Sequence, residues 1–80
     1  MYIAFGKEKF VLSDEIIGIF DLDITSQSHL TRQFLREAEK SGSVVNTAED
    51  LPKSFIVCRE KEKNVVYLSQ MAPSTLIRRL

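Results

Sequence analysis

Apolar residues in this chain mostly recur with the period of a strand or of a helix, but one segment follows neither period. Residues 16–21 read Ile-Ile-Gly-Ile-Phe-Asp. A strand that is buried on one face alternates apolar and polar residues, whereas this run places apolar side chains on both faces. We therefore predict a strand that needs cover on both sides, which makes it a candidate for the centre of a sheet.

Shorter apolar runs bounded by turn residues predict the remaining strands. These runs are residues 2–5, 10–12, 43–46, 54–59 and 65–68. Turns at 6–9 and 60–64 predict two hairpins, and a loop is expected over 47–52. Gly18 interrupts the apolar run 16–22, which predicts a bulge or a close backbone approach, for which a neighbouring subunit is one candidate.

A helical period appears between Ser28 and Ser41. Leucine, phenylalanine and alanine side chains recur there at helical spacing and form one apolar stripe. The stripe consists of Leu30, Phe34, Leu35 and Ala38. Residues 23–28 are polar and predict a turn that supplies the N-cap, and Gly42 suits the position after the last helical turn. Pro73 predicts the first position of a short terminal helix that runs to about residue 80.

This order of elements predicts an α+β fold in a single domain over residues 1–80. We expect a mainly antiparallel sheet of about five to six short strands, one amphipathic central helix and a short C-terminal helix. A chain of 80 residues buries only about 60% of its unfolded surface. Because a partner subunit can supply the missing cover, the sequence predicts a homo-oligomer. Its expected interface is the apolar strand, through Ile17, Gly18, Ile19 and Phe20.

The charge balance narrows the possible partners. Eleven Lys and Arg offset eleven Asp and Glu, whereas dedicated nucleic-acid domains usually have a net basic charge. Affinity for DNA would therefore have to come from a local patch, or from a small patch repeated around an oligomer. No targeting sequence, lipid anchor or membrane-spanning apolar stretch is visible, so we expect a cytoplasmic protein without a membrane partner.

Candidate catalytic and metal-binding residues are few. His29 is expected to be an exposed residue of the first helical turn, although Ser28 beside it is a conceivable nucleophile. Cys58 is the only cysteine, so it excludes an intrachain disulfide, and we expect it to be a buried small side chain. Asp21 and Asp23 fit either a weak divalent-ion site or solvated carboxylates near a helix start. We predict no enzyme activity, cofactor, metal site or small-molecule substrate.

Basic residues are the remaining candidates for function. Lys53 stands at the start of a predicted strand, and Lys7 and Lys9 lie in one turn, from which lysines can reach phosphate. Arg78 and Arg79 end the terminal helix, where they suit either DNA contact or the negative end of the helix dipole. We rank Lys53 first for DNA contact.

Three segments together resemble a known family. They are residues 16–21, Leu51-Pro52-Lys53-Ser54-Phe55-Ile56-Val57 and Pro73-Ser74-Thr75-Leu76-Ile77-Arg78-Arg79. They are similar to the RemA/RemB family of bacterial extracellular-matrix (biofilm) regulators, and most similar to the RemB branch. The resemblance implies a small cytoplasmic activator of matrix genes. In the RemA branch, subunits assemble into rings that present arginines to DNA.

The residue-by-residue comparison with that branch shows two departures. An arginine ahead of the apolar strand falls on Glu15, and an arginine-rich loop falls on residues 51–54, where only Lys53 is positive. The sequence thus supports a non-enzymatic, homo-oligomeric regulator of matrix genes that acts on transcription directly or through a partner. The alternative is an oligomeric structural or protein-interaction module of the same fold that binds no nucleic acid.

Overall fold

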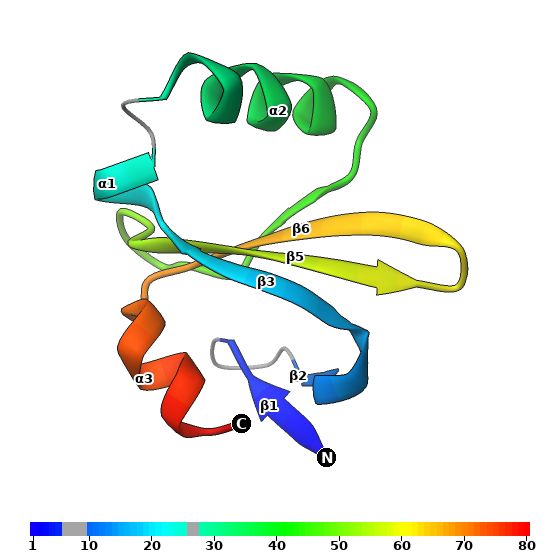
Figure 1. Ribbon diagram of the computed structural model, residues 1–80, viewed down its shortest axis with the longest axis vertical. Coiled ribbons are helices and arrows are strands. Elements are labelled where there is room, and N and C mark those ends of the chain that lie inside the picture. Colours follow the sequence, from blue (N-terminus) through cyan, green and yellow to red (C-terminus); the bar gives the residue numbers. More distant parts are fainter. Residues whose placement is uncertain (6–9, 26–27) are drawn as a thin grey trace.

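The centre of the main sheet is a hairpin of two long strands. The computed structural model describes residues 1–5, 10–25 and 28–80, and it places β5 (Ser54–Glu60) beside β6 (Lys63–Ser69) as an antiparallel hairpin (Figure 1). Lys61 and Glu62 form the turn with φ angles of 49° and 68°, the left-handed conformation that matches the twist of a two-residue hairpin. The predicted hairpin is confirmed, with a shorter turn than residues 60–64.

The four-stranded sheet has the order β3-β5-β6-β4, with β3 spanning Ile16–Asp21 and β4 spanning Val44–Asn46. β3 and β5 are antiparallel, whereas β4 and β6 are parallel. The prediction that residues 16–21 form the central strand is wrong, because this segment is an edge strand. β5 and β6 occupy the centre since they are the strands with buried side chains on both faces.

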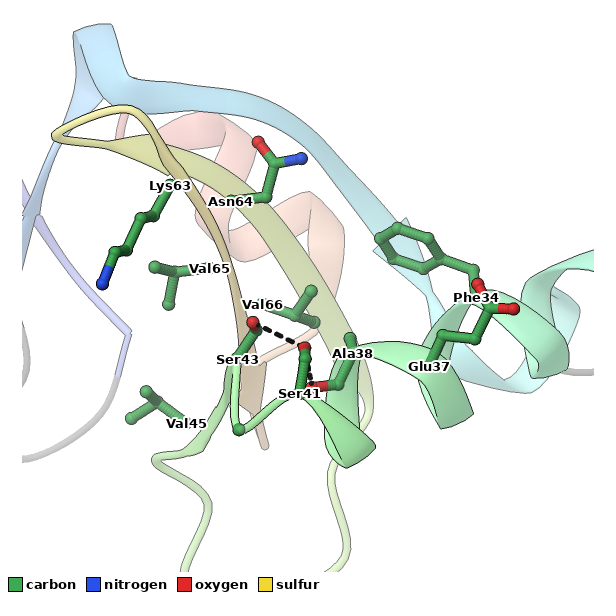
Figure 2. A pocket seen from close by; sticks show the side chains of 11 residues that line it. Phe34, Glu37, Ala38, Ser41, Ser43, Val45, Lys63, Asn64, Val65 and Val66 are labelled. Atoms are coloured by element: carbon green, nitrogen blue, oxygen red, sulfur yellow. Dashed lines mark hydrogen bonds between the residues drawn. The ribbon is translucent and has the colours of Figure 1, made fainter.

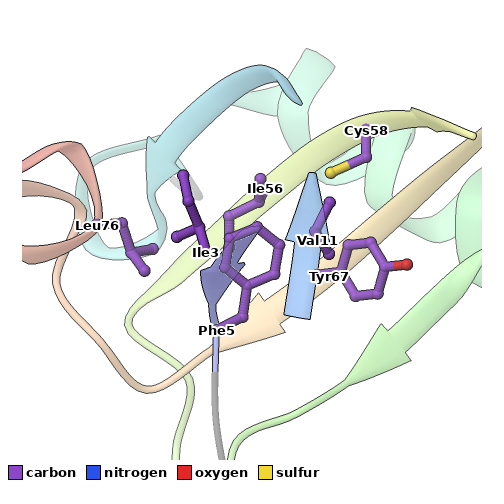
Figure 3. Close-up of a cluster of buried hydrophobic side chains, with 7 residues drawn as sticks. All are labelled: Ile3, Phe5, Val11, Ile56, Cys58, Tyr67 and Leu76. Carbon is purple, nitrogen blue, oxygen red and sulfur yellow. The ribbon is translucent and has the colours of Figure 1, made fainter. Parts of the chain in front are cut away.

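The first face of the sheet carries the main core. β1 (Tyr2–Ala4) and β2 (Phe10–Leu12) form a separate antiparallel pair on this side, together with α3 (Pro73–Arg78) (Figure 1). Their apolar side chains meet those of β5 and β6 in one cluster, which consists of Ile3, Phe5, Val11, Ile56, Cys58, Tyr67 and Leu76 (Figure 3). The rings of Phe5 and Tyr67 are tilted by 54° with centroids 5.5 Å apart, a favourable aromatic geometry.

A short helix, α1 (Leu22–Thr25), follows β3 directly. The predicted end of the strand near residue 22 is confirmed to within one residue, whereas the first part of the expected polar turn 23–28 is helical, and residues 26–27 lie outside the described part of the chain. The helix begins because the Asp21 carboxylate accepts a hydrogen bond from the Asp23 backbone N–H at 2.8 Å, as side chains do at helix starts.

The second face of the sheet is covered by α2 (His29–Lys40) (Figure 1). Its predicted ends are confirmed: the Ser28 hydroxyl caps the Thr31 N–H at 3.5 Å, and Gly42 follows the helix with a φ of 74°. However, α2 contains no buried residue. The α+β fold is confirmed, but the apolar stripe of its central helix is only partly covered.

Candidate interaction surface around strand β3

The exposed position of β3 follows from its register. Ile16 lies opposite Cys58 and Gly18 lies opposite Val57, so the intervening Ile17 is an extra residue in the ladder. The predicted bulge is therefore confirmed. It allows Ile16 and Ile19 to pack against the same core although they are three positions apart. The irregular apolar pattern of residues 16–21 results from this bulge as well as from cover on two faces.

Gly18 is needed for a different contact from the one predicted. A Cβ atom at this position would lie 2.8 Å from two atoms of the Phe20 ring, closer than real Cβ contacts. The Phe20 ring thus occupies the space that a larger residue would fill. The ring in turn stacks on Phe55 with centroids 4.9 Å apart and an angle of 18°. The close approach at Gly18 is therefore made within the chain.

Four large apolar side chains gather on the α2 side of β3. Ile17 is 63% exposed and Phe20 39%, while Leu30 and Phe34 of α2 are 75% and 40% exposed. All four line one groove of about 360 Å³, with Phe55 and Val57 of the sheet also in its wall. Scattered exposed apolar residues are ordinary, but a group around one groove marks an interaction surface.

A second groove lies on the opposite side of the same strand. It has a volume of about 250 Å³ and is lined by Ile16, Ile17, Gly18 and Ile19, with Ile77 and Leu80 beside them. Ile17 lines both grooves. We call the two grooves and the edge strand between them the β3 surface. The four predicted interface residues, Ile17 to Phe20, all lie on it.

A third cavity, of about 580 Å³, lies between the end of α2 and strands β4 and β6 (Figure 2). Val45, Val65 and Val66 line it from the sheet, and Phe34 reaches it from α2. At its rim the hydroxyls of Ser41 and Ser43 are 2.9 Å apart, and the Ser41 hydroxyl donates to the Ala38 carbonyl at 3.0 Å. The hydroxyls of Ser41 and Ser43 thus form hydrogen bonds at the C-terminal end of α2.

The described residues among the predicted DNA contacts lie on two parts of the fold, before β5 and at the end of α3. Lys53 is exposed, and its backbone is fixed by hydrogen bonds to Ser69 and Leu22 at 2.8 and 3.0 Å, where β5 begins. Arg79 instead donates to the Ala4 carbonyl of β1 at 3.4 Å, and Arg78 donates to Ser74 within its own helix at 3.4 Å. Lys7 and Lys9 lie outside the described residues.

Glu15 lies close enough to Tyr67 to affect the pKa of its hydroxyl. The Tyr67 hydroxyl donates a hydrogen bond to the Glu60 carboxylate. Burial, followed by this hydrogen bond, raises the pKa of Tyr67 well above its ordinary value, and Glu15 is near enough to add a small contribution. Glu15 therefore carries a negative charge close enough to act on the Tyr67 hydroxyl.

The residues with catalytic potential lie on four different elements of the fold. His29 is exposed at the first position of α2, and Cys58 is fully buried in the core, as the sequence predicts. Asp21 ends β3 and Asp23 lies in α1. Among the residues that the structure describes, no three potential metal ligands lie together. No helix in the described part is both long and apolar enough to span a membrane.

Sequence reasoning identified the β3 half of the surface but missed the α2 half. Leu30 and Phe34 were assigned to a stripe facing the core, yet both remain exposed and complete the groove. The signal that was available is the small size of Thr31 and Ala38 on the same helix face, which leaves α2 few bulky side chains to insert into the sheet.

Comparison with known proteins gives two matches over nearly the whole chain. The family model described as RemA-like, extracellular matrix regulatory protein A-like, matches residues 2–80. The chain is also 32% identical over 79 residues to Extracellular matrix regulatory protein B of Bacillus subtilis (strain 168). That alignment covers 99% of this chain and 89% of the relative. Both matches confirm the resemblance carried by the sequence segments.

Proposed function

Because this chain belongs to the RemA-like family of extracellular matrix regulatory proteins, we propose that it regulates matrix genes as a homo-oligomer that contacts DNA, without catalysing a reaction. The observation that carries the proposal is the β3 surface, where large apolar side chains surround an edge strand. Burying this apolar area between copies is favourable, at roughly 25 cal/mol per Å². A ring is the closed form expected when such contacts are made head to tail.

Lys53 is the proposed DNA contact within each subunit. Its side chain is exposed, while its backbone N–H and C=O are both hydrogen-bonded. The ammonium group therefore extends into solvent from a well-fixed backbone position. One lysine gives little affinity alone. Repetition of Lys53 around an oligomer would add phosphate contacts and compensate for the zero net charge of the chain. Lys7, Lys9, Arg78 and Arg79 rank after it.

The test combines oligomer mass with salt-dependent DNA binding. We expect light scattering to report an assembly, and affinity for a matrix-gene promoter fragment to fall as salt rises. Lys53→Glu should abolish most of this binding. Lys61→Glu is the matched control, because Lys61 is also exposed but follows β5 at its other end. If Lys53→Glu and Lys61→Glu bind DNA equally well, Lys53 is not a DNA contact. If the wild type shows no salt-sensitive binding, direct DNA contact is contradicted.

A protein-interaction module without a nucleic-acid ligand is the second candidate. The identity of Glu15 favours it, since an acidic residue stands where the RemA branch is expected to have an arginine. This candidate predicts an assembly of the same mass with and without DNA. An increase in mass on adding promoter DNA at low salt would exclude it.

A further inference from the structure

Besides its apolar side chains, β3 has an edge that pairs with no other strand in the described part of the chain. In an antiparallel ladder, residues that bond to the partner strand alternate with residues that point away. The Leu22 N–H donates to the Lys53 carbonyl at 3.0 Å. Leu22, and by alternation Phe20, therefore belong to the residues whose backbone groups point toward β5. The N–H and C=O of Ile19 therefore point away from β5, toward the free edge.

β4 supplies a matching edge at the other side of the same sheet. The Ser43 carbonyl accepts from Val66 at 2.8 Å and the Thr47 N–H donates to Leu68 at 2.9 Å, so these two residues face β6. By the same alternation, the backbone groups of Val44 and Asn46 point outward. One copy of the chain thus carries an open edge on β3 and another on β4.

The two edges run in the same direction. β3 is antiparallel to β5, β5 is antiparallel to β6, and β4 is parallel to β6. A second copy that continues the sheet with its α2 face on the same side therefore brings its β4 parallel to β3. We propose that copies associate by this strand addition, in which β4 of one copy extends the sheet at β3 of the next. The inference rests on the proposed function in requiring self-association, and it names the contact.

Side chains on both faces fit this arrangement. Val45 is exposed and lines the cavity on the α2 side of β4. In a continued sheet, Val45 of the second copy lies on the α2 face, beside the 360 Å³ groove of Ile17 and Phe20. Val44 of that copy, one residue earlier, lies on the opposite face, beside the 250 Å³ groove. Strand addition commonly combines backbone bonding with pockets for alternate side chains.

Charge also favours a second copy in the parallel direction. Asp14 is exposed just before β3, and Lys63 is exposed at the start of β6, at the end where its parallel neighbour β4 begins. Parallel addition brings the starts of β3 and β4 to the same end of the contact. Asp14 of one copy then approaches Lys63 of the next. An antiparallel contact would separate these charges.

Residue-resolved hydrogen exchange tests the backbone contact. As the concentration of the full chain is raised from the monomer range into the assembled range, we expect exchange at the Ile19 and Val44 amides to slow at least tenfold. The Phe20 amide, which already faces β5, is the control and should change much less. If the chain associates but exchange at the Ile19 amide or at the Val44 amide does not slow, the contact between β3 and β4 is wrong, while the proposed homo-oligomer still stands. A chain that stays monomeric would overturn both.

Two sets of variants test the contact without disturbing the core. Ile17→Lys should increase the dissociation constant at least tenfold, whereas Leu51→Lys, at a residue that is 81% exposed and lines neither groove of the β3 surface, should not. Asp14→Lys and Lys63→Asp should each weaken association roughly two- to fivefold, as exposed ion pairs do, and the double exchange should restore it. Additive losses in the double exchange would overturn the parallel contact between β3 and β4.

Discussion

The hydrogen bond between Tyr67 and Glu60 gives a pH-dependent prediction for stability. Tyr67 is buried and donates its phenolic proton to Glu60 from the adjacent strand. Removing the hydroxyl in Tyr67→Phe leaves the ring packing against Phe5 but deprives the carboxylate of its donor. Hydrogen bonds to charged groups contribute about 1.5–3 kcal/mol, so we expect unfolding free energy at neutral pH to fall by about that amount.

The sign of the pH dependence follows from the raised pKa of Tyr67. Burial and the Glu60 hydrogen bond keep the folded phenol protonated, whereas the unfolded phenol loses its proton near pH 10. The stabilisation is therefore complete below pH 10 and is lost as pH rises above it, by about 1.4 kcal/mol per pH unit. Tyr67→Phe lacks this term, so its deficit relative to wild type should shrink between pH 10 and 11.

Urea unfolding at pH 7, 9, 10 and 11 measures both effects. Tyr2→Phe is the matched control, because Tyr2 is largely exposed and should give the same stability as wild type at each pH. A deficit for Tyr67→Phe that stays constant or grows above pH 10 would refute the reasoning. A deficit below 0.5 kcal/mol at pH 7 would show that the hydrogen bond contributes little.

Three further predictions concern single residues. Gly18→Ala forces the Phe20 ring to move outward, and since that ring is already partly exposed we expect a loss of about 1 kcal/mol in urea unfolding; a Phe20→Leu background should reduce this loss, and an unchanged loss would contradict the steric argument. Gly42→Ala has open space around the new methyl, so its expected cost of about 1 kcal/mol comes from the φ of 74° alone, and Gly42→Asn should cost less; equal costs would argue against a backbone origin. The Cys58 thiol is fully buried and should react with an aromatic disulfide reagent at least 100-fold more slowly in buffer than in 8 M urea, whereas comparable rates would place it at the surface.

The sequence by itself determined the elements that depend on local chemistry. Ser28 and Gly42 mark the ends of α2 because capping and left-handed conformations are properties of single residues and their neighbours. The bulge at Gly18 and the hairpin between β5 and β6 were likewise readable from local pattern. The α+β class followed from the order of these elements, and the family from three short segments.

Only the tertiary structure decided which strand lies at the edge of the sheet. Residues 16–21 are apolar enough for a central strand, but β5 and β6 pair with each other and place β3 outside. The same holds for Leu30 and Phe34, whose helical spacing predicts burial but which stay exposed on a helix without buried residues. Pairing partners and helix depth depend on contacts between distant residues, which hydrophobic periodicity does not encode.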